Sequence, residues 1–105
     1  MHIQIVNFNL KGASEADYRA LCDQLAPAFA VMPGLIAKVW LADPANNTYG
    51  GVYTWANKAA METYMQSEMF HNVVNHPNLT NITSKDFGIL AGPTQVTHGL
   101  TMVAA

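Results

Sequence analysis

Lys38 and Asn7 are polar residues set among apolar ones, and each has a side chain suited to holding a ligand. Lys38 alternates with Trp40 on one face of a predicted strand. If that face lines a cavity, burial would lower the pKa of the lysine, and the amine could anchor an anion. A lysine whose amine reaches solvent is the alternative. Asn7 lies in another apolar strand, where a half-buried amide needs hydrogen-bond partners and could bind a ligand oxygen.

His71 is the histidine best suited by its position to acid–base chemistry. It follows Tyr64 by seven residues, so an unbroken helix would put both on one face, and a histidine beside a cavity suits general-base work near neutral pH. A surface position on a short helix is the alternative. His71 and His76 are five residues apart, which is a poor spacing for a shared metal ion. The sequence contains no H-E-x-x-H, CxxC, P-loop or dinucleotide motif, so we expect neither a metal nor a nucleotide cofactor.

Two adjacent glycines, Gly50 and Gly51, lie inside a predicted strand. Glycine there lowers stability and gives neighbouring side chains nothing to pack against. The same segment, YGGVYTW, carries the large side chains of Tyr49, Tyr53 and Trp55. The sequence thus removes side-chain volume where it concentrates aromatic rings. Core filling is the alternative role for Trp40 and Trp55, because tryptophan buries a large area wherever it lies.

The composition indicates one small domain with a poorly charged surface. The 105 residues leave no room for a second core. Half of the residues are hydrophobic and only 11% are charged, against about 25% in an ordinary soluble chain. A second copy of the chain would cover part of this surface, so we expect a homodimer. A surface of Asn, Thr, Gln and Ser is the alternative.

The sequence also bears on partners and location. A net charge of −2 without a cluster of Lys and Arg argues against a nucleic-acid partner. No basic leader opens the chain, and the longest uncharged apolar stretch, LAPAFAVMPGLIA, is too short to cross a bilayer. Cys22 is the single cysteine, which fits a reducing compartment. We therefore expect a cytoplasmic protein without a membrane partner.

Hydrophobic alternation predicts four strands, at residues 2–10, 35–42, 48–56 and 80–90. Helical spacing predicts a first helix capped by Ser14, with Asp17 completing a capping box. Asn57 is predicted to cap a second helix, and Ser67 a short separate one. Residues 92–105 show no clear period and are predicted to form a tail. The first helix carries an apolar stripe that we expect to be buried: Tyr18, Leu21, Cys22, Leu25, Phe29 and Met32.

This element order, β-α-β-β-α-β, is that of the ferredoxin-like α+β fold. Its four-stranded antiparallel sheet carries both helices on one face and leaves the other face open. We assign Trp40 and several strand aromatics to the open face, which must then be covered. A second copy packed face to face would cover it, and each subunit would enclose a cavity between its sheet and its helices.

Four motifs resemble those of the YdhR-like mono-oxygenase family: PGLIAKVW (33–40), YGGVY (49–53), SKDF (84–87) and GPTQV (92–96). That family belongs to the dimeric α+β barrel superfamily, which also contains antibiotic-biosynthesis mono-oxygenases. The resemblance runs from the first strand to about residue 97 and includes the proline inside the first helix. It implies a single dimeric α+β barrel domain and a mono-oxygenase activity.

Members of this superfamily that oxidise aromatic polyketides use no metal and no flavin. The carbanion or phenolate of their substrate itself reduces dioxygen, so the protein must bind a flat apolar ligand and promote its deprotonation. By this resemblance, Gly50 and Gly51 make room for the ligand. Its walls would be Tyr49, Tyr53 and Trp55. Trp55 matches a tryptophan of the quinone-forming members, whereas their partner asparagine corresponds to Gly51 here.

We therefore predict a cofactor-independent mono-oxygenase that acts on a small aromatic or polyketide-like substrate. The predicted catalytic residues are His71, Trp55 and Asn7. The predicted substrate-binding residues are Lys38, Trp40, Tyr49, Gly50, Gly51, Tyr53 and Tyr64.

Three alternatives stay open. Haem-degrading mono-oxygenases share the fold, and Asn7 matches their distal asparagine, whereas their axial histidine and haem-distorting tryptophan correspond to Val74 and Tyr64. A polyketide cyclase of the same superfamily would use Tyr64 and His71 for an aldol closure. The third alternative is a dimer that binds a small ligand without turnover.

Overall fold

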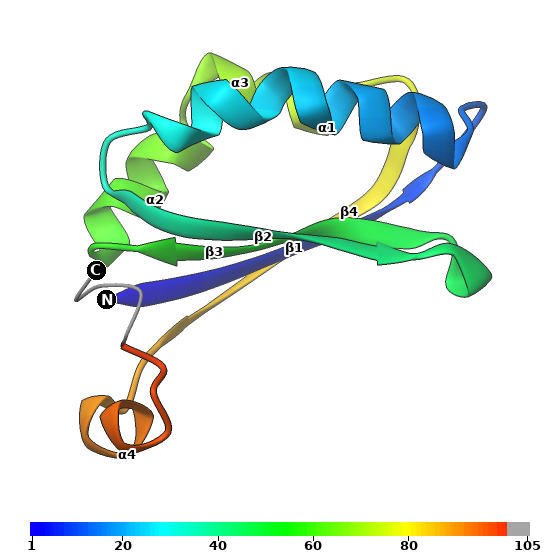
Figure 1. The fold of residues 1–105 in the computed structure, drawn as a ribbon. Helices are drawn as coiled ribbons and strands as arrows, with labels where there is room; N and C mark the ends of the chain where they lie inside the picture. Colours follow the sequence, from blue (N-terminus) through cyan, green and yellow to red (C-terminus); the bar gives the residue numbers. More distant parts are fainter. Residues whose placement is uncertain (101–105) are drawn as a thin grey trace.

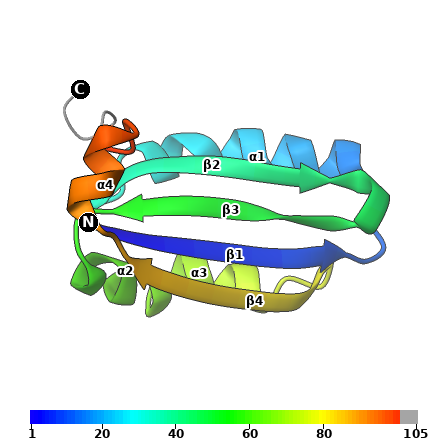
Figure 2. The ribbon, with the colours of Figure 1, turned by 90° about the horizontal axis from the view of Figure 1, so that it is seen from below.

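The computed structural model describes residues 1–100 and contains one four-stranded antiparallel sheet (Figures 1 and 2). The strands lie in the order β2-β3-β1-β4, and their bounds are β1 His2–Leu10, β2 Leu35–Asp43, β3 Thr48–Trp55 and β4 Leu79–Gly88. Three helices cover one face: α1 Glu15–Ala30, α2 Lys58–Met65 and α3 Glu68–Val74. A short 3₁₀ helix, η1 (Pro44–Asn46), joins β2 to β3. The predicted ferredoxin-like order is confirmed.

The helices begin at the polar residues that the sequence indicates. Ser14 Oγ accepts a hydrogen bond from the backbone N–H of Asp17 at 3.1 Å, and the Asp17 carboxylate accepts one from the Ser14 N–H. Asn57 and Ser67 cap α2 and α3 in the same way. These bonds satisfy donors that have no partner inside a helix. The cap at Ser67 also separates α3 from α2.

Alternation along the strands divides the sheet into a covered face and an open face. On β1, Gln4 and Val6 are buried under the helices, whereas Ile3 and Ile5 point to the open face. The open face carries mostly apolar residues: Ile3, Ile5, Val39, Leu41, Val52 and Phe87. Figure 2 shows this face with no helix over its central strands.

The assignment of Trp40 to the open face is wrong. Of the other strand aromatics in residues 1–100, Phe87 lies on the open face, whereas Phe8, Tyr49, Tyr53 and Trp55 lie on the covered one. Pairing of β2 with β3 sets Trp40 opposite Gly51 and Lys38 opposite Tyr53, so all of them share the covered face. There the Trp40 ring packs edge-on against Phe29 of α1, with centroids 5.5 Å apart. The cause is a long-range one, because only strand pairing decides which side of β2 lies under α1.

The segment predicted as a tail without a clear period begins with a short helix, α4 (Ala91–Val96), and its residues 101–105 lie outside the described part. α4 projects on the side of the sheet opposite the other helices (Figure 1). None of the helices in residues 1–100 is long and apolar enough to cross a membrane.

Candidate functional site

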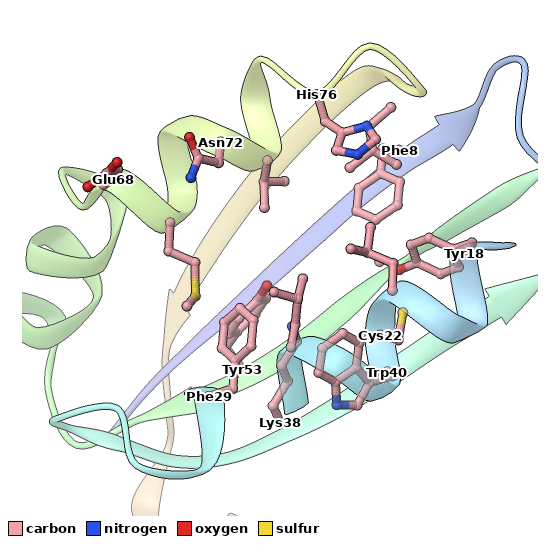
Figure 3. Close-up of a pocket in the computed structure, with 16 residues that line it drawn as sticks. Phe8, Tyr18, Cys22, Phe29, Lys38, Trp40, Tyr53, Glu68, Asn72 and His76 are labelled. Atoms are coloured by element: carbon pink, nitrogen blue, oxygen red, sulfur yellow. The ribbon is translucent and has the colours of Figure 1, made fainter. Parts of the chain in front are cut away.

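A pocket of about 380 Å³ lies between α1, α3 and the covered face of the sheet (Figure 3). This volume falls in the range of about 300–1,000 Å³ that is typical of small-molecule sites. Most of the lining is apolar or aromatic: Phe8, Tyr18, Leu21, Cys22, Leu25, Phe29, Trp40, Tyr53, Met69, Val73 and Leu79. Gly50 completes the wall, and the charged or polar lining residues are Lys38, Glu68, Asn72 and His76.

Lys38 is the cation of this pocket, and aromatic rings surround its amine. Nζ lies 3.4 Å from the centroid of Trp40, 3.5 Å from that of Phe29 and 4.7 Å from that of Tyr53. Within residues 1–100, no carboxylate forms an ion pair with Lys38. Burial disfavours the charged form and lowers the pKa of Lys38 to about 7, although the coulombic effect of Cys22 acts in the opposite direction. At neutral pH this lysine can therefore act as a base.

Gly51 provides the space that the Lys38 side chain occupies. A Cβ added at Gly51 would lie 2.9 Å from Lys38 Cε and 3.3 Å from Tyr53 Cε1. Both distances are shorter than ordinary carbon–carbon contacts, so a larger residue would push the lysine out of the rings. The absence of a side chain at Gly51 therefore leaves room for the Lys38 side chain, which extends from β2 over the neighbouring strand β3.

Gly50 is required by the backbone. Its φ of +147° is a conformation that residues with a side chain rarely adopt, and an added Cβ would lie 1.8 Å from the carbonyl oxygen of Val6. The two positions therefore require glycine for different reasons. Gly50 permits the close approach of β1, and Gly51 leaves room for the Lys38 side chain.

Trp55 and Tyr64 lie in the core beside the pocket. Trp55 is fully buried, donates Nε1–H to Gln4 Oε1 at 3.0 Å and stacks on Tyr53 with ring planes only 2° apart. Tyr64 is buried among Phe29, Tyr53 and Trp55, with its centroid 5.3 Å from that of Trp55. Neither residue lines the pocket, so both support the wall from behind.

Three other predicted residues lie away from the pocket. Asn7 belongs to the open face and donates a long hydrogen bond, 3.4 Å, to the Tyr49 carbonyl. The hydroxyl of Tyr49 donates to Glu15 Oε1 at 2.9 Å, beside a neighbouring cleft along α1. His71 is exposed on α3 and is absent from the lining. The break at Ser67 changes the helical phase, so Tyr64 and His71 do not meet at the pocket.

The structure brings four predicted residues together at the pocket, namely Lys38, Trp40, Gly50 and Tyr53, and adds others that sequence reasoning missed. His76 is the most consequential, because its half-buried ring stands in the lining. Met69, Val73 and His76 follow helical spacing, and that periodicity could have indicated it. We expected the apolar stripe of α1 to pack into the core. Most of its residues line the pocket instead.

The unfolding free energy is expected to depend on pH through Lys38. Its pKa is lowered on folding, so between pH 7 and its unfolded value the unfolded chain binds more protons, and stability rises with pH. Burial raises the pKa of Cys22, which cancels this rise once the unfolded thiol ionises at about pH 8.5. Burial also raises the pKa of Tyr18, Tyr53 and Tyr64, which reverses the trend once the unfolded tyrosines ionise at about pH 10. From pH 7 to 8.5, the stability of the wild type relative to Lys38→Met should rise by about 1.6 kcal/mol, because the slope is about half of 1.4 kcal/mol per pH unit at pH 7 and approaches that value above about pH 8.

Urea unfolding at several pH values measures this difference. Lys58→Met is the matched control, because Lys58 is exposed at the start of α2, and its difference from the wild type should not change with pH. If the difference in unfolding free energy between the wild type and Lys38→Met did not change with pH, the amine would titrate alike in the folded and unfolded states.

Comparison with known proteins finds one matching family and several solved structures with the same fold. A family described as "Putative mono-oxygenase ydhR" matches residues 3–100. The fold matches a crystal structure of a putative antibiotic biosynthesis monooxygenase from Deinococcus radiodurans, with a TM-score of 0.71 and 18% identity over 88% of this chain and 95% of that one. No curated protein matches the sequence.

Two further solved structures share the fold at low identity. SnoaB, a cofactor-independent oxygenase from Streptomyces nogalater, matches with a TM-score of 0.66 and 18% identity over 85% of this chain and 93% of its own. The heme-degrader MhuD from Mycobacterium tuberculosis, solved with two hemes in its active site, matches with a TM-score of 0.68 and 15% identity over 86% and 96%. At these identities the likeness shows the fold alone.

Proposed function

The chain belongs to the ydhR mono-oxygenase family, and on that premise we propose that it oxidises a small aromatic substrate with dioxygen and without a metal or flavin. One observation carries the proposal: an amine with a pKa of about 7 lies unpaired, within residues 1–100, in a pocket of aromatic walls. A base in such a position suits a flat substrate whose conjugate base reacts with oxygen. SnoaB, which has the same fold, is described as a cofactor-independent oxygenase.

An anthrone-type substrate has an acidic CH₂ group opposite a carbonyl. The neutral amine of Lys38 takes one proton from the CH₂ group and leaves an enolate. The enolate passes one electron to dioxygen, and the two radicals combine to form a C–O bond and a peroxide. Loss of water then gives a second carbonyl, so one oxygen atom enters the product, and the other leaves as water with both hydrogens of the CH₂ group.

Aerobic incubation of the purified protein with anthrone tests this function. Quinone should form faster than in a protein-free control, and prior treatment of the protein with a metal chelator should leave the rate unchanged. A panel of anthrones and naphthols that shows no acceleration would contradict the proposal and favour a dimer that binds a ligand without turnover.

One observation favours haem binding as a second candidate. His76 lines the pocket, and its imidazole could ligate iron through Nε2 once the hydrogen bond from the Asn78 N–H to Nδ1 breaks and the ring proton moves to Nδ1. Bound haem would supply the activation of oxygen. Val74, which aligns with the axial histidine of haem degraders, is 45% exposed and absent from the lining. A haem titration followed at the Soret band separates the candidates. A saturable shift that is lost in His76→Leu supports haem, and a spectrum equal to that of free haem removes this candidate.

We also propose that a second copy of the chain covers the open face and that the assembly is a homodimer. Val39 and Phe87 on that face are 53% and 52% exposed. The residues paired with them, Val52 and Ile3, are apolar, whereas Lys85 brings one charge to the same face. A face of this kind is a typical subunit interface.

Val39→Glu should weaken the dimer at least tenfold, because it puts a charge into an apolar contact; tenfold corresponds to about 1.4 kcal/mol. Sedimentation equilibrium measures the effect. Val31→Glu is the matched control, since Val31 is 80% exposed at the end of α1 and lies away from this face. A wild type that sediments as a monomer would contradict the dimer.

A further inference from the structure

The ring of His76 is held in one tautomer by its own turn. The backbone N–H of Asn78 donates to His76 Nδ1 at 3.1 Å. A backbone N–H can only donate, so Nδ1 must accept. The neutral imidazole therefore carries its proton on Nε2, and this Nε2–H is a hydrogen-bond donor rather than a base.

The turn itself is fixed to the rest of the fold. Leu79 N–H donates to the His76 carbonyl at 3.1 Å, and Lys11 N–H donates to the Asn78 carbonyl at 2.9 Å. The Asn78 side chain donates in return to the Lys11 carbonyl at 2.8 Å. Pro77, between the histidine and the asparagine, has its φ limited by its ring. A donor held by so many bonds needs little rearrangement to act on a ligand.

His76 and Lys38 lie on opposite sides of the pocket. Figure 3 shows the imidazole beside Phe8 at the end of α3, and the lysine across the pocket with Trp40. The other polar lining residues are less suited to a buried contact. Glu68 and Asn72 are exposed, and the Tyr53 hydroxyl lies 3.5 Å from that of Tyr64.

We propose that His76 is a catalytic residue, whose Nε2–H donates a hydrogen bond to the carbonyl oxygen of the substrate while Lys38 removes a proton from the carbon across the ring. In this step a C–H bond breaks, an N–H bond forms on Lys38, and the electron pair moves to the oxygen that His76 holds. No bond to His76 forms or breaks. The assignment rests on the proposed function and deepens it, because it selects substrates whose carbonyl and acidic carbon lie opposite each other in one ring.

Binding of xanthone tests the donor without any turnover. Xanthone is a flat ketone shaped like anthrone, but an ether oxygen replaces the acidic carbon. With a ¹³C-labelled carbonyl, its infrared band should shift to lower wavenumber on binding to the wild type. His76→Gln keeps an N–H donor and should keep much of the shift, whereas His76→Leu should bind xanthone and lose it. An equal shift in the wild type and His76→Leu would overturn the assignment.

Exchange of the anthrone CH₂ hydrogens in D₂O without oxygen tests the catalytic role. His76→Leu should slow this exchange about a hundredfold, which is typical of the loss of one oxyanion donor, and His76→Gln should recover part of the rate. His71→Leu tests the other histidine. If hydrogen exchange slows in His71→Leu but not in His76→Leu, the assignment is overturned.

The two tests also separate the possible failures. A shifted xanthone band without hydrogen exchange or oxidation of anthrone would overturn both the catalytic role of His76 and the oxygenase function. His76 would then only donate a hydrogen bond to a bound ligand. Absence of xanthone binding to the wild type would overturn the assignment together with the proposed ligand class. Oxidation that is unchanged in His76→Leu would overturn the assignment alone.

Discussion

Lys38→Met is expected to slow the oxidation of anthrone, and its anaerobic hydrogen exchange in D₂O, by about a hundredfold or more, the usual cost of losing a general base. Methionine fills a similar apolar volume and keeps the aromatic walls in contact, but it cannot take a proton. The wild-type rate should rise as the pH passes about 7, where Nζ loses its proton, and this rise should be absent in the variant. Quinone absorbance and proton NMR measure the two reactions.

Lys58→Met provides the matched control for this result, since Lys58 is exposed and does not line the pocket. Both variants should bind xanthone, which separates loss of the base from loss of the site. If Lys38→Met exchanged the anthrone hydrogens as fast as the wild type, the role of the lysine as the base would be contradicted, whatever the oxidation rate.

Gly50→Ala is expected to lower the free energy of unfolding by about 3 kcal/mol or more, which is a large effect for one methyl group. The added Cβ would lie 1.8 Å from the Val6 carbonyl oxygen, and φ at this position is +147°. β3 cannot move aside easily because it pairs with β1 on one side and β2 on the other. Urea unfolding followed by tryptophan fluorescence measures the loss.

Two other glycines make this prediction specific. Gly92→Ala meets nothing within 4 Å and should change stability by less than about 1 kcal/mol. Gly51→Ala contacts the flexible end of Lys38, so the protein should fold while its oxidation rate falls. A Gly50→Ala protein as stable as the wild type would mean that β1 and β3 do not approach as closely as described.

The pair of glycines shows how far reasoning from sequence reaches into this site. The segment YGGVYTW indicates a space beside aromatic rings, and the pocket does lie there, with Tyr53 in its wall. The sequence does not reveal that a lysine from the neighbouring strand fills part of the space. Lys38 lies far from Gly51 along the chain, and only the register of β2 against β3 brings the two together.

His71 and His76 show the opposite limit. Helical spacing from Tyr64 favours His71 only if one helix continues, and the cap at Ser67 interrupts it. The pocket lining therefore contains His76, which comes after α3 and depends on a turn anchored to the end of β1. The helical spacing of His76 from the pocket-lining residues of α3 could have indicated the side on which the histidine lies, but no local pattern indicates the contact of its turn with the end of β1.

The element order and the starts of the helices are predictable from local sequence signals, because caps and alternation act between residues a few positions apart. The caps at Ser14, Asn57 and Ser67 are examples. Which face of β2 lies under α1, and how Lys38 becomes partly buried, followed instead from tertiary packing. Those outcomes depend on strand register and on packing between distant segments, which minimise exposed apolar area over the whole fold.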